Sequence, residues 1–250
     1  SEPVTQSMET KQAQVEATMR LAPVIPVVII DDVKAAVPMA RALVAGGTPA
    51  IEVTLRTHAA LDAIRAIAQE VEGAVVGVGT VLNAEHLAAA KAAGARFAVS
   101  PGVSPKLLDA ADDSDLPLLP GAATASEVMT LIERGYRFLK FFPAVPAGGT
   151  KLIGAWASPL PQVKFCPTGG ISLSTASDFL ALPNVLCVGG SWLTPADKLK
   201  AGDWAAIELL ARARHPASGS RARQGWSGSP RQSLSARGPR PRTSPAATSA

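Results

Sequence analysis

Cysteine, aromatic residues and long apolar runs are scarce in this chain. It has two cysteines and one tyrosine in 250 residues, and aromatic residues make up 4% of the total. Cys166 and Cys187 lie in the apolar runs VKFCPTGG and VLCVGG, which favours two reduced, buried thiols over a disulfide or a metal site. No apolar run approaches the roughly 20 residues of a membrane-spanning helix. We therefore expect neither a disulfide nor a metal, and no association with a membrane.

The start of the chain lacks the features of a secretory signal. Residues 1–14, SEPVTQSMETKQAQ, are polar and acidic where such a signal has a basic start and an apolar stretch. This absence predicts a cytoplasmic location. Residues 1–7, ahead of Met8, are interpreted as an N-terminal extension.

Acidic residues are missing from the last part of the chain, residues 216–250, which carry six arginines among serine, proline and glycine. Residues 1–215 then hold 18 basic and 20 acidic groups, a net charge of −2, although the whole chain stands at +4. A globular part so close to neutral argues against a nucleic-acid-binding domain. Because residues 216–250 lack apolar periodicity, we predict that they are disordered. A tail that binds nucleic acid or an acidic partner is the alternative.

Short β-rich runs alternate with alanine-rich amphipathic segments over residues 22–214, a pattern typical of parallel strands joined by crossover helices. Eight strands are predicted, over residues 23–30, 50–54, 74–80, 96–100, 116–121, 137–142, 162–170 and 184–190. Helices are predicted over residues 8–20, 33–46, 58–71, 83–93, 104–112, 124–134, 148–156, 172–181 and 195–213. Eight strands close a barrel, so the predicted fold is an α/β, eightfold β/α (TIM) barrel over residues 8–215 with an N-terminal helix and a disordered tail.

Chemically unusual residues follow the predicted strands at their C-terminal ends, where barrels of this kind carry their sites. Glu52, Thr54 and Arg56 alternate along one strand, so an acid and a guanidinium share one face. Arg56 can clamp a carboxylate through two hydrogen bonds, and Glu52 can act as a base. An internal ion pair between Glu52 and Arg56 is an equally good interpretation of these residues alone.

Glycine pairs end the last two predicted strands, as Gly169-Gly170 and as Gly189-Gly190 followed by Ser191. Either pair alone would indicate an ordinary tight turn. Both pairs, however, stand at the two strand ends where barrels usually bind phosphate. Glycine leaves backbone N–H groups open to an anion, and the N-termini of the helices that follow add positive potential. The sequence therefore predicts a phosphate site, to which Ser191 can add a hydroxyl.

Lys140 lies in YRFLKFFPA (136–144), a run that otherwise has the composition of a buried strand. With a side-chain period of 2, Phe138, Lys140 and Phe142 share one face. A lysine at a strand end can instead lay its stem on the phenylalanines and extend its ammonium to water. If it points inward it is poorly solvated, which frees the amine as a nucleophile toward a carbonyl carbon. Amine, base, carboxylate clamp and phosphate site together predict a phosphorylated keto acid as substrate and a Schiff base as intermediate.

Eight motifs recur in the order known from one enzyme family. They are IEVTLRT (51–57), VGVGTVL (76–82), VSPG (99–102), LPG (119–121), KFFPA (140–144), GG followed by K (148–151), KFCPTGG (164–170) and LPNVLCVGGSWL (182–193). On these motifs the chain resembles the 2-keto-3-deoxy-6-phosphogluconate (KDPG) aldolases, class I lyases of the Entner–Doudoroff pathway that often also act as 4-hydroxy-2-oxoglutarate aldolases. The resemblance implies an eightfold barrel, a homotrimer, and no metal or organic cofactor.

The resemblance also implies a role for each residue of the site. Lys140 would form the Schiff base and Glu52 would transfer protons. The implied contacts to the substrate are Arg56 and Thr80 for the carboxylate, Pro101 and Thr168 for the pyruvoyl group, and Gly169, Gly170 and Ser191 for the phosphate. The implied reactions are cleavage of KDPG to pyruvate and glyceraldehyde 3-phosphate, and of 4-hydroxy-2-oxoglutarate to pyruvate and glyoxylate.

Departures from the family pattern are mild, and three rival functions stay open. His58 stands where small residues or proline are usual, GAATASE (121–127) varies a stretch closer to GISTPSE, and the basic tail has no counterpart. Within the aldolases, the galactonate-derived epimer is the competing substrate. A phosphosugar isomerase or epimerase would use Glu52 as a base and would not need Lys140. A non-enzymatic barrel would present residues 216–250 to nucleic acid through salt-sensitive binding.

Overall fold

The computed structural model describes residues 5–214. The predicted disordered tail over residues 216–250 and most of the predicted extension lie outside the described residues. The helices are α1 (Met8–Met19), α2 (Ala36–Ala45), α3 (Ala60–Glu70), α4 (Ala84–Ala92), α5 (Pro105–Asp112), α6 (Ala125–Glu133), α7 (Ala144–Ala147), α8 (Gly149–Ala155), α9 (Ala176–Leu180), α10 (Ala196–Ala201) and α11 (Trp204–Ala213), with a 3₁₀ turn over Val33–Ala35. The strands are β1 (Val24–Val28), β2 (Ala50–Thr54), β3 (Val75–Gly79), β4 (Ala98–Val99), β5 (Leu118–Leu119), β6 (Gly121–Ala122), β7 (Phe138–Phe141), β8 (Lys164–Pro167) and β9 (Val188–Gly190).

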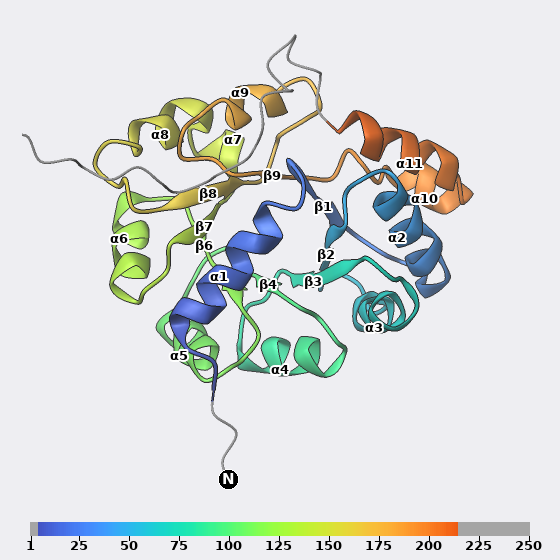
Figure 1. Ribbon diagram of the computed structural model, residues 1–250, viewed down its shortest axis with the longest axis horizontal. Helices are drawn as coiled ribbons and strands as arrows, with labels where there is room; N and C mark the ends of the chain where they lie inside the picture. The colour runs from blue at the N-terminus through green and yellow to red at the C-terminus, as the bar shows by residue number, and fades with distance from the viewer. Residues whose placement is uncertain (1–4, 215–250) are drawn as a thin grey trace, which may run out of the picture. The chain divides into compact units, whose positions relative to one another are not determined.

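The strands form an α/β fold with parallel pairing in every strand pair of the described residues. A curled six-stranded sheet has the order β5-β4-β3-β2-β1-β9, and a three-stranded sheet has the order β6-β7-β8. Two single bridges, Phe165–Val185 and Thr168–Gly189, join β8 to the segment that ends in β9. The strands lie at the centre and the helices that connect them lie around the outside (Figure 1).

Three departures from the predicted elements have a local cause. The predicted strand over 116–121 is divided into β5 and β6 at Pro120, which has no N–H to continue the ladder. The predicted helix over 195–213 is divided into α10 and α11 at Gly202, whose φ of 66° ends the first helix in the left-handed region. The short helix α7 was not predicted, because its four residues are too few to show a helical period.

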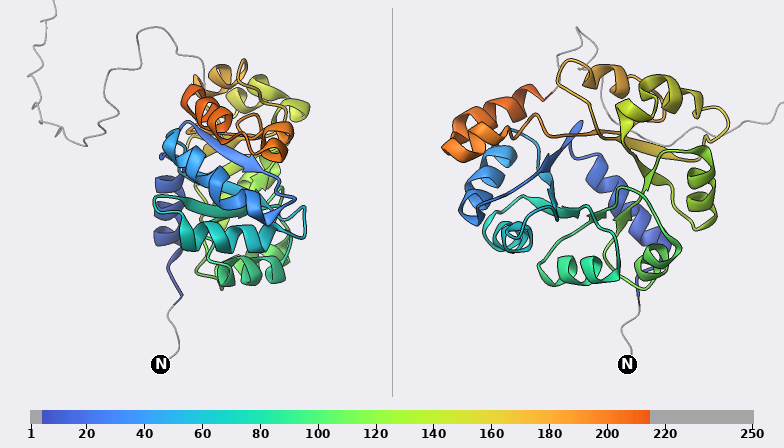
Figure 2. Two further views of the ribbon diagram at one scale, coloured as in Figure 1. Left: turned by 90° about the vertical axis from the view of Figure 1, so that its right-hand side faces the viewer. Right: turned by 180° about the vertical axis from the view of Figure 1, so that it is seen from behind.

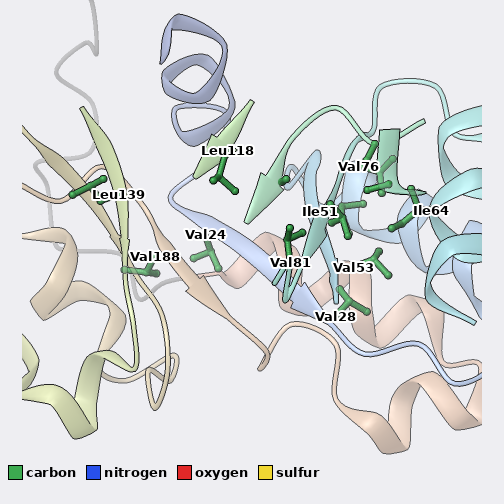
Figure 3. Close-up of a cluster of buried hydrophobic side chains, with 14 of the residues drawn as sticks. Val24, Val28, Ile51, Val53, Ile64, Val76, Val81, Leu118, Leu139 and Val188 are labelled. Atoms are coloured by element: carbon green, nitrogen blue, oxygen red, sulfur yellow. The ribbon is translucent and has the colours of Figure 1, made fainter. Parts of the chain in front are cut away.

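Alternation along the strands separates two apolar clusters. The larger cluster packs one face of the sheet against the surrounding helices and includes Ile51, Val53, Leu139 and Ile64 (Figure 3). The smaller cluster collects side chains from the opposite face, including Ala50 of β2, Phe138 of β7 and residues of β1, β4, β5 and β8. Glu52 and Lys140 alternate with Ile51, Val53 and Leu139, so they lie on this inner face.

Helix α1 closes the N-terminal end of the strands: it lies across them in Figure 1 and along the left-hand side of the ribbon in Figure 2 (left). Its Val15 and Met19 complete the smaller cluster. Lys11 of α1 is 4% exposed, and its Nζ donates to three backbone carbonyls at and just beyond the end of α5, those of Ala111 (2.9 Å), Asp112 (3.2 Å) and Ser114 (3.0 Å). Burial lowers the pKa of Lys11, and it outweighs the opposing attraction of nearby aspartates. None of the helices in the described part of the chain is long and apolar enough to cross a membrane.

Candidate active site

Lys140 and Glu52 meet on the inner face of the strands. Lys140 stands on β7 between Gly121 of β6 and Cys166 of β8, and Glu52 stands in the middle of β2. The two residues are 3% and 4% exposed, and Lys140 Nζ lies 3.7 Å from Glu52 Oε1. The interpretation in which the ammonium of Lys140 reaches water is therefore wrong.

The carboxylate of Glu52 is poorly satisfied. Its Oε1 is buried and accepts no hydrogen bond from the residues that the structure describes. A buried acceptor without a donor costs about 1–3 kcal/mol, so a substrate group that donates a hydrogen bond to this oxygen would be bound favourably. The ion pair of Glu52 in the described residues is with Lys140 and not with Arg56, which decides against the internal Glu52–Arg56 pair.

Gly79 leaves space for the carboxylate of Glu52. This glycine was not identified from the sequence as a residue of the site. A Cβ built at Gly79 would overlap Glu52 Oε1. Gly189 does the same for Thr168, whose Oγ1 a Cβ at that position would overlap. The signal was present in the glycine-rich strand VGVGT (76–80), since a glycine inside a strand often marks a close approach.

Arg56 and Thr80 come together as the resemblance implied. Arg56 Nε donates to Thr80 Oγ1 at 3.2 Å, and the guanidinium is exposed at the C-terminal edge of β2. Thr80 has a φ of 60°, a left-handed conformation that is strained for a β-branched residue. Such a conformation costs on the order of 1–3 kcal/mol and tends to persist at functional sites. In this conformation the Thr80 hydroxyl accepts the hydrogen bond from Arg56.

Pro101 and Thr168 lie beside the strands that flank Lys140. A Cβ at Gly121, the residue paired with Lys140 on β6, would overlap the carbonyl of Pro101, so the Pro101 turn packs closely on that strand. Thr168 is 6% exposed and continues β8, with its N–H donating to the carbonyl of Phe141 at 2.9 Å. Both predicted residues therefore adjoin the two neighbours of β7.

The two glycine turns lie side by side, because the bridge between Thr168 and Gly189 joins the ends of β8 and β9. Gly169 and Gly170 have φ values of 107° and 77°, a region open to glycine, and Gly170 is exposed. Ser191 is exposed at the end of β9. It lines a cavity of about 830 Å³ whose other lining residues include Val27, Ile29, Asp31, Trp192, Thr194 and Lys200.

Cys166 and Cys187 are free and buried on the same inner face. A hydrogen bond with Cys166, together with burial, raises the pKa of the Cys187 thiol. A protonated thiol is a poor nucleophile and a poor metal ligand. In residues 5–214 no three His, Cys, Asp or Glu side chains are grouped so that they could hold a metal ion.

Comparison with known proteins agrees with this geometry. Residues 15–210 match the family described as KDPG and KHG aldolase, where KHG is 4-hydroxy-2-oxoglutarate. The KHG/KDPG aldolase of Escherichia coli is 53% identical over 205 residues, which are 82% of this chain and 96% of that protein.

Two solved structures are similar over nearly their whole length. KDPG aldolase from Legionella pneumophila, with pyruvate captured as a covalent carbinolamine, has 44% identity and a TM-score of 0.78 over 79% of this chain and 96% of that one. The aldolase of Zymomonas mobilis with 3-phosphoglycerate has 48% identity and a TM-score of 0.78 over 82% of this chain and 96% of that one. With its fold, its inner lysine and these matches, the chain belongs to the KDPG and KHG aldolase family.

Proposed function

We propose that this chain is a class I aldolase that cleaves KDPG to pyruvate and glyceraldehyde 3-phosphate, and 4-hydroxy-2-oxoglutarate to pyruvate and glyoxylate. The observation that carries the proposal is the buried Lys140 Nζ, 3.7 Å from a Glu52 oxygen that has no other partner in the described residues. A nucleophile beside a base is the arrangement that covalent catalysis on a ketone requires. The carbinolamine in the Legionella relative is the product of such an attack by an amine on pyruvate.

The reaction begins when the ammonium of Lys140 gives a proton to Glu52. The neutral amine then attacks the C2 carbonyl carbon, and the carbonyl oxygen takes up the proton that the attacking nitrogen loses. Loss of this hydroxyl as water, with a proton supplied from Glu52, leaves an iminium. Glu52, now a carboxylate, removes the proton from the C4 hydroxyl, and the C3–C4 bond breaks. Its electrons move into the iminium, which becomes an enamine as the aldehyde leaves. Protonation at C3 and addition of water then release pyruvate and restore the amine.

The other predicted residues hold the substrate in this proposal. Arg56, positioned by Thr80, binds the carboxylate, since a guanidinium can donate two parallel hydrogen bonds to it. Pro101 and Thr168 line the space for the pyruvoyl group on either side of β7. For the phosphate we propose the paired turns after β8 and β9, with contacts from Gly169, Gly170 and Ser191. Gly170 and Ser191 are exposed and Gly169 is partly exposed, which supports this assignment.

We also propose that the strands close into the eightfold barrel predicted for residues 8–215. Support comes from Pro120, a single residue between β5 and β6, because β5 pairs with β4 while β6 pairs with β7. The bridges from β8 toward β9, and the pairing of β9 with β1, support closure on the other side. Counting β5 and β6 as one interrupted strand gives the eight strands of the barrel.

A homotrimer in the cytoplasm is part of the same proposal. The family resemblance supports the trimer, and the free thiols of Cys166 and Cys187 suit a reducing compartment. Light scattering of the purified chain, which has a mass of 25.6 kDa, is expected to give three times that value. A monomeric mass at working concentrations contradicts the proposed trimer but leaves the proposed Schiff-base reaction unaffected.

The decisive experiment is to trap the Schiff base. The protein is incubated with pyruvate and sodium borohydride and analysed by intact and peptide mass spectrometry, beside a Lys140→Ala control. A reduced pyruvyl adduct on the peptide that contains Lys140, absent from the control, supports the proposal. A folded protein without an adduct rules the proposal out and leaves the isomerase or epimerase, which would use Glu52 as a base and would not need Lys140.

A further inference from the structure

The ring of Phe142 lies over the amine of Lys140. Its centroid is 4.7 Å from Lys140 Nζ, and the two residues share the inner face of β7 and its continuation. On another side Nζ faces Glu52 Oε1 at 3.7 Å. In the described residues the nitrogen thus has two electrostatic neighbours. Glu52 can gain or lose a proton, whereas the ring of Phe142 cannot.

A benzene ring attracts a cation because its face carries partial negative charge. The attraction operates within about 6 Å of the centroid and is stronger in a site that is shielded from water. Lys140 is 3% exposed, so this condition holds. During the proposed reaction the nitrogen is neutral in the carbinolamine, positive in the iminium and neutral again in the enamine. The ring therefore favours the iminium over both species that flank it.

Glu52 cannot fill this role throughout the cycle. It loses a proton when the carbinolamine hydroxyl departs as water, and it gains one from the C4 hydroxyl before the C3–C4 bond breaks. At that second point the carboxyl is neutral while the nitrogen still carries its positive charge. Of the two neighbours, only Phe142 then still attracts the nitrogen.

We propose that Phe142 is a catalytic residue that stabilises the iminium on Lys140 through the face of its ring. The inference rests on the proposed Schiff-base function. In the step concerned, the C2–OH bond of the carbinolamine breaks, Glu52 gives its proton to the departing water, and the nitrogen lone pair forms the C=N bond. The positive charge that results faces the ring. A phenylalanine that acted only as an apolar wall would contribute equally to every intermediate.

Fluorination separates these two roles, because fluorine atoms keep the shape and apolar character of the ring while they withdraw the negative charge from its face. Phe142 is replaced by 4-fluoro-, 3,5-difluoro- and 3,4,5-trifluorophenylalanine through an expanded genetic code. The matched control is the same series at Phe138, which lies on the same strand and face but inside the apolar cluster. The readout is the rate of borohydride trapping at saturating pyruvate, since borohydride reduces the iminium and not the carbinolamine.

The trapping rate is expected to fall stepwise with each added fluorine at Phe142, by about three- to tenfold over the series, and to stay level at Phe138. A Phe142→Leu variant is expected to fall at least as far as the trifluoro variant. A flat series at Phe142, in protein whose unmodified form traps normally, overturns this inference alone. If the unmodified protein forms no adduct, it is the proposed function that fails.

Discussion

Two buried lysines stand at opposite ends of the strands, and their surroundings differ in one decisive respect. Lys11, at the end that α1 closes, is 4% exposed and donates to three backbone carbonyls. Lys140, toward the other end, is 3% exposed and faces the carboxylate of Glu52, beyond hydrogen-bond distance, and the ring of Phe142. Burial alone therefore does not mark a reactive lysine. A fully hydrogen-bonded ammonium holds the structure together, whereas one left short of acceptors is available for chemistry.

The largest expected effect tests the reactive end. Glu52→Gln keeps the shape of the side chain but removes the proton acceptor, so kcat for KDPG cleavage is expected to fall by about 10²–10⁴-fold. Over a long incubation with pyruvate the variant should still yield the borohydride adduct, because its nucleophile is intact. Coupled detection of pyruvate with lactate dehydrogenase measures kcat. Turnover at the wild-type rate would remove Glu52 as the base.

The second prediction tests the closed end. Lys11→Met retains the apolar stem but removes the donor to three carbonyls, and hydrogen bonds from a charged group contribute about 1.5–3 kcal/mol. The free energy of unfolding, measured in urea, is expected to fall by roughly 2 kcal/mol while kcat per folded molecule stays unchanged. If Lys11→Met is as stable as the wild type, or if folded Lys11→Met loses kcat, then Lys11 does not have the purely structural role that distinguishes it from Lys140.

The smallest effect concerns pH. Burial sets the pKa of Lys11 below its ordinary value of 10.5, so between the two values the unfolded chain binds more protons than the folded one. The free energy of unfolding therefore gains a positive slope as pH rises toward 10.5, relative to Lys11→Met, which has no such group. Urea midpoints of both proteins from neutral pH upward measure the slope. Parallel curves for the two proteins contradict the lowered pKa.

The sequence predicts the reactive lysine more readily than the structural one. Lys140 interrupts an apolar strand, and the strand period assigns it a face together with Phe138 and Phe142. Lys11 stands in a polar helix, METKQAQVEATM, where a lysine is ordinarily solvated. Its acceptors follow about 100 residues later in the chain, so its burial depends on tertiary packing that no local pattern records.

The remaining differences have the same origin. Glu52 pairs with Lys140 rather than Arg56 because β2 and β7 face each other across the inner face. The sequence spacing of Glu52 and Arg56 carries no information about that arrangement. Pro120 and Gly202, by contrast, are visible breaks, and composition alone could have placed both. The positions of the strands were predicted, but several ends were placed too far out: the predicted strands over 96–100 and 184–190 correspond to Ala98–Val99 and Val188–Gly190.

The apolar cluster beneath Lys140 limits the routes by which small molecules can reach and leave the site. Phe97, Leu119 and Phe138 fill the inner face below the amine, and Met19 of α1 covers them, so in the described part of the chain the site has a floor. The aldehyde fragment and the water that releases pyruvate therefore cannot pass through this end, which leaves the opposite end of the strands. The departing aldehyde and the incoming water therefore share one end of the fold.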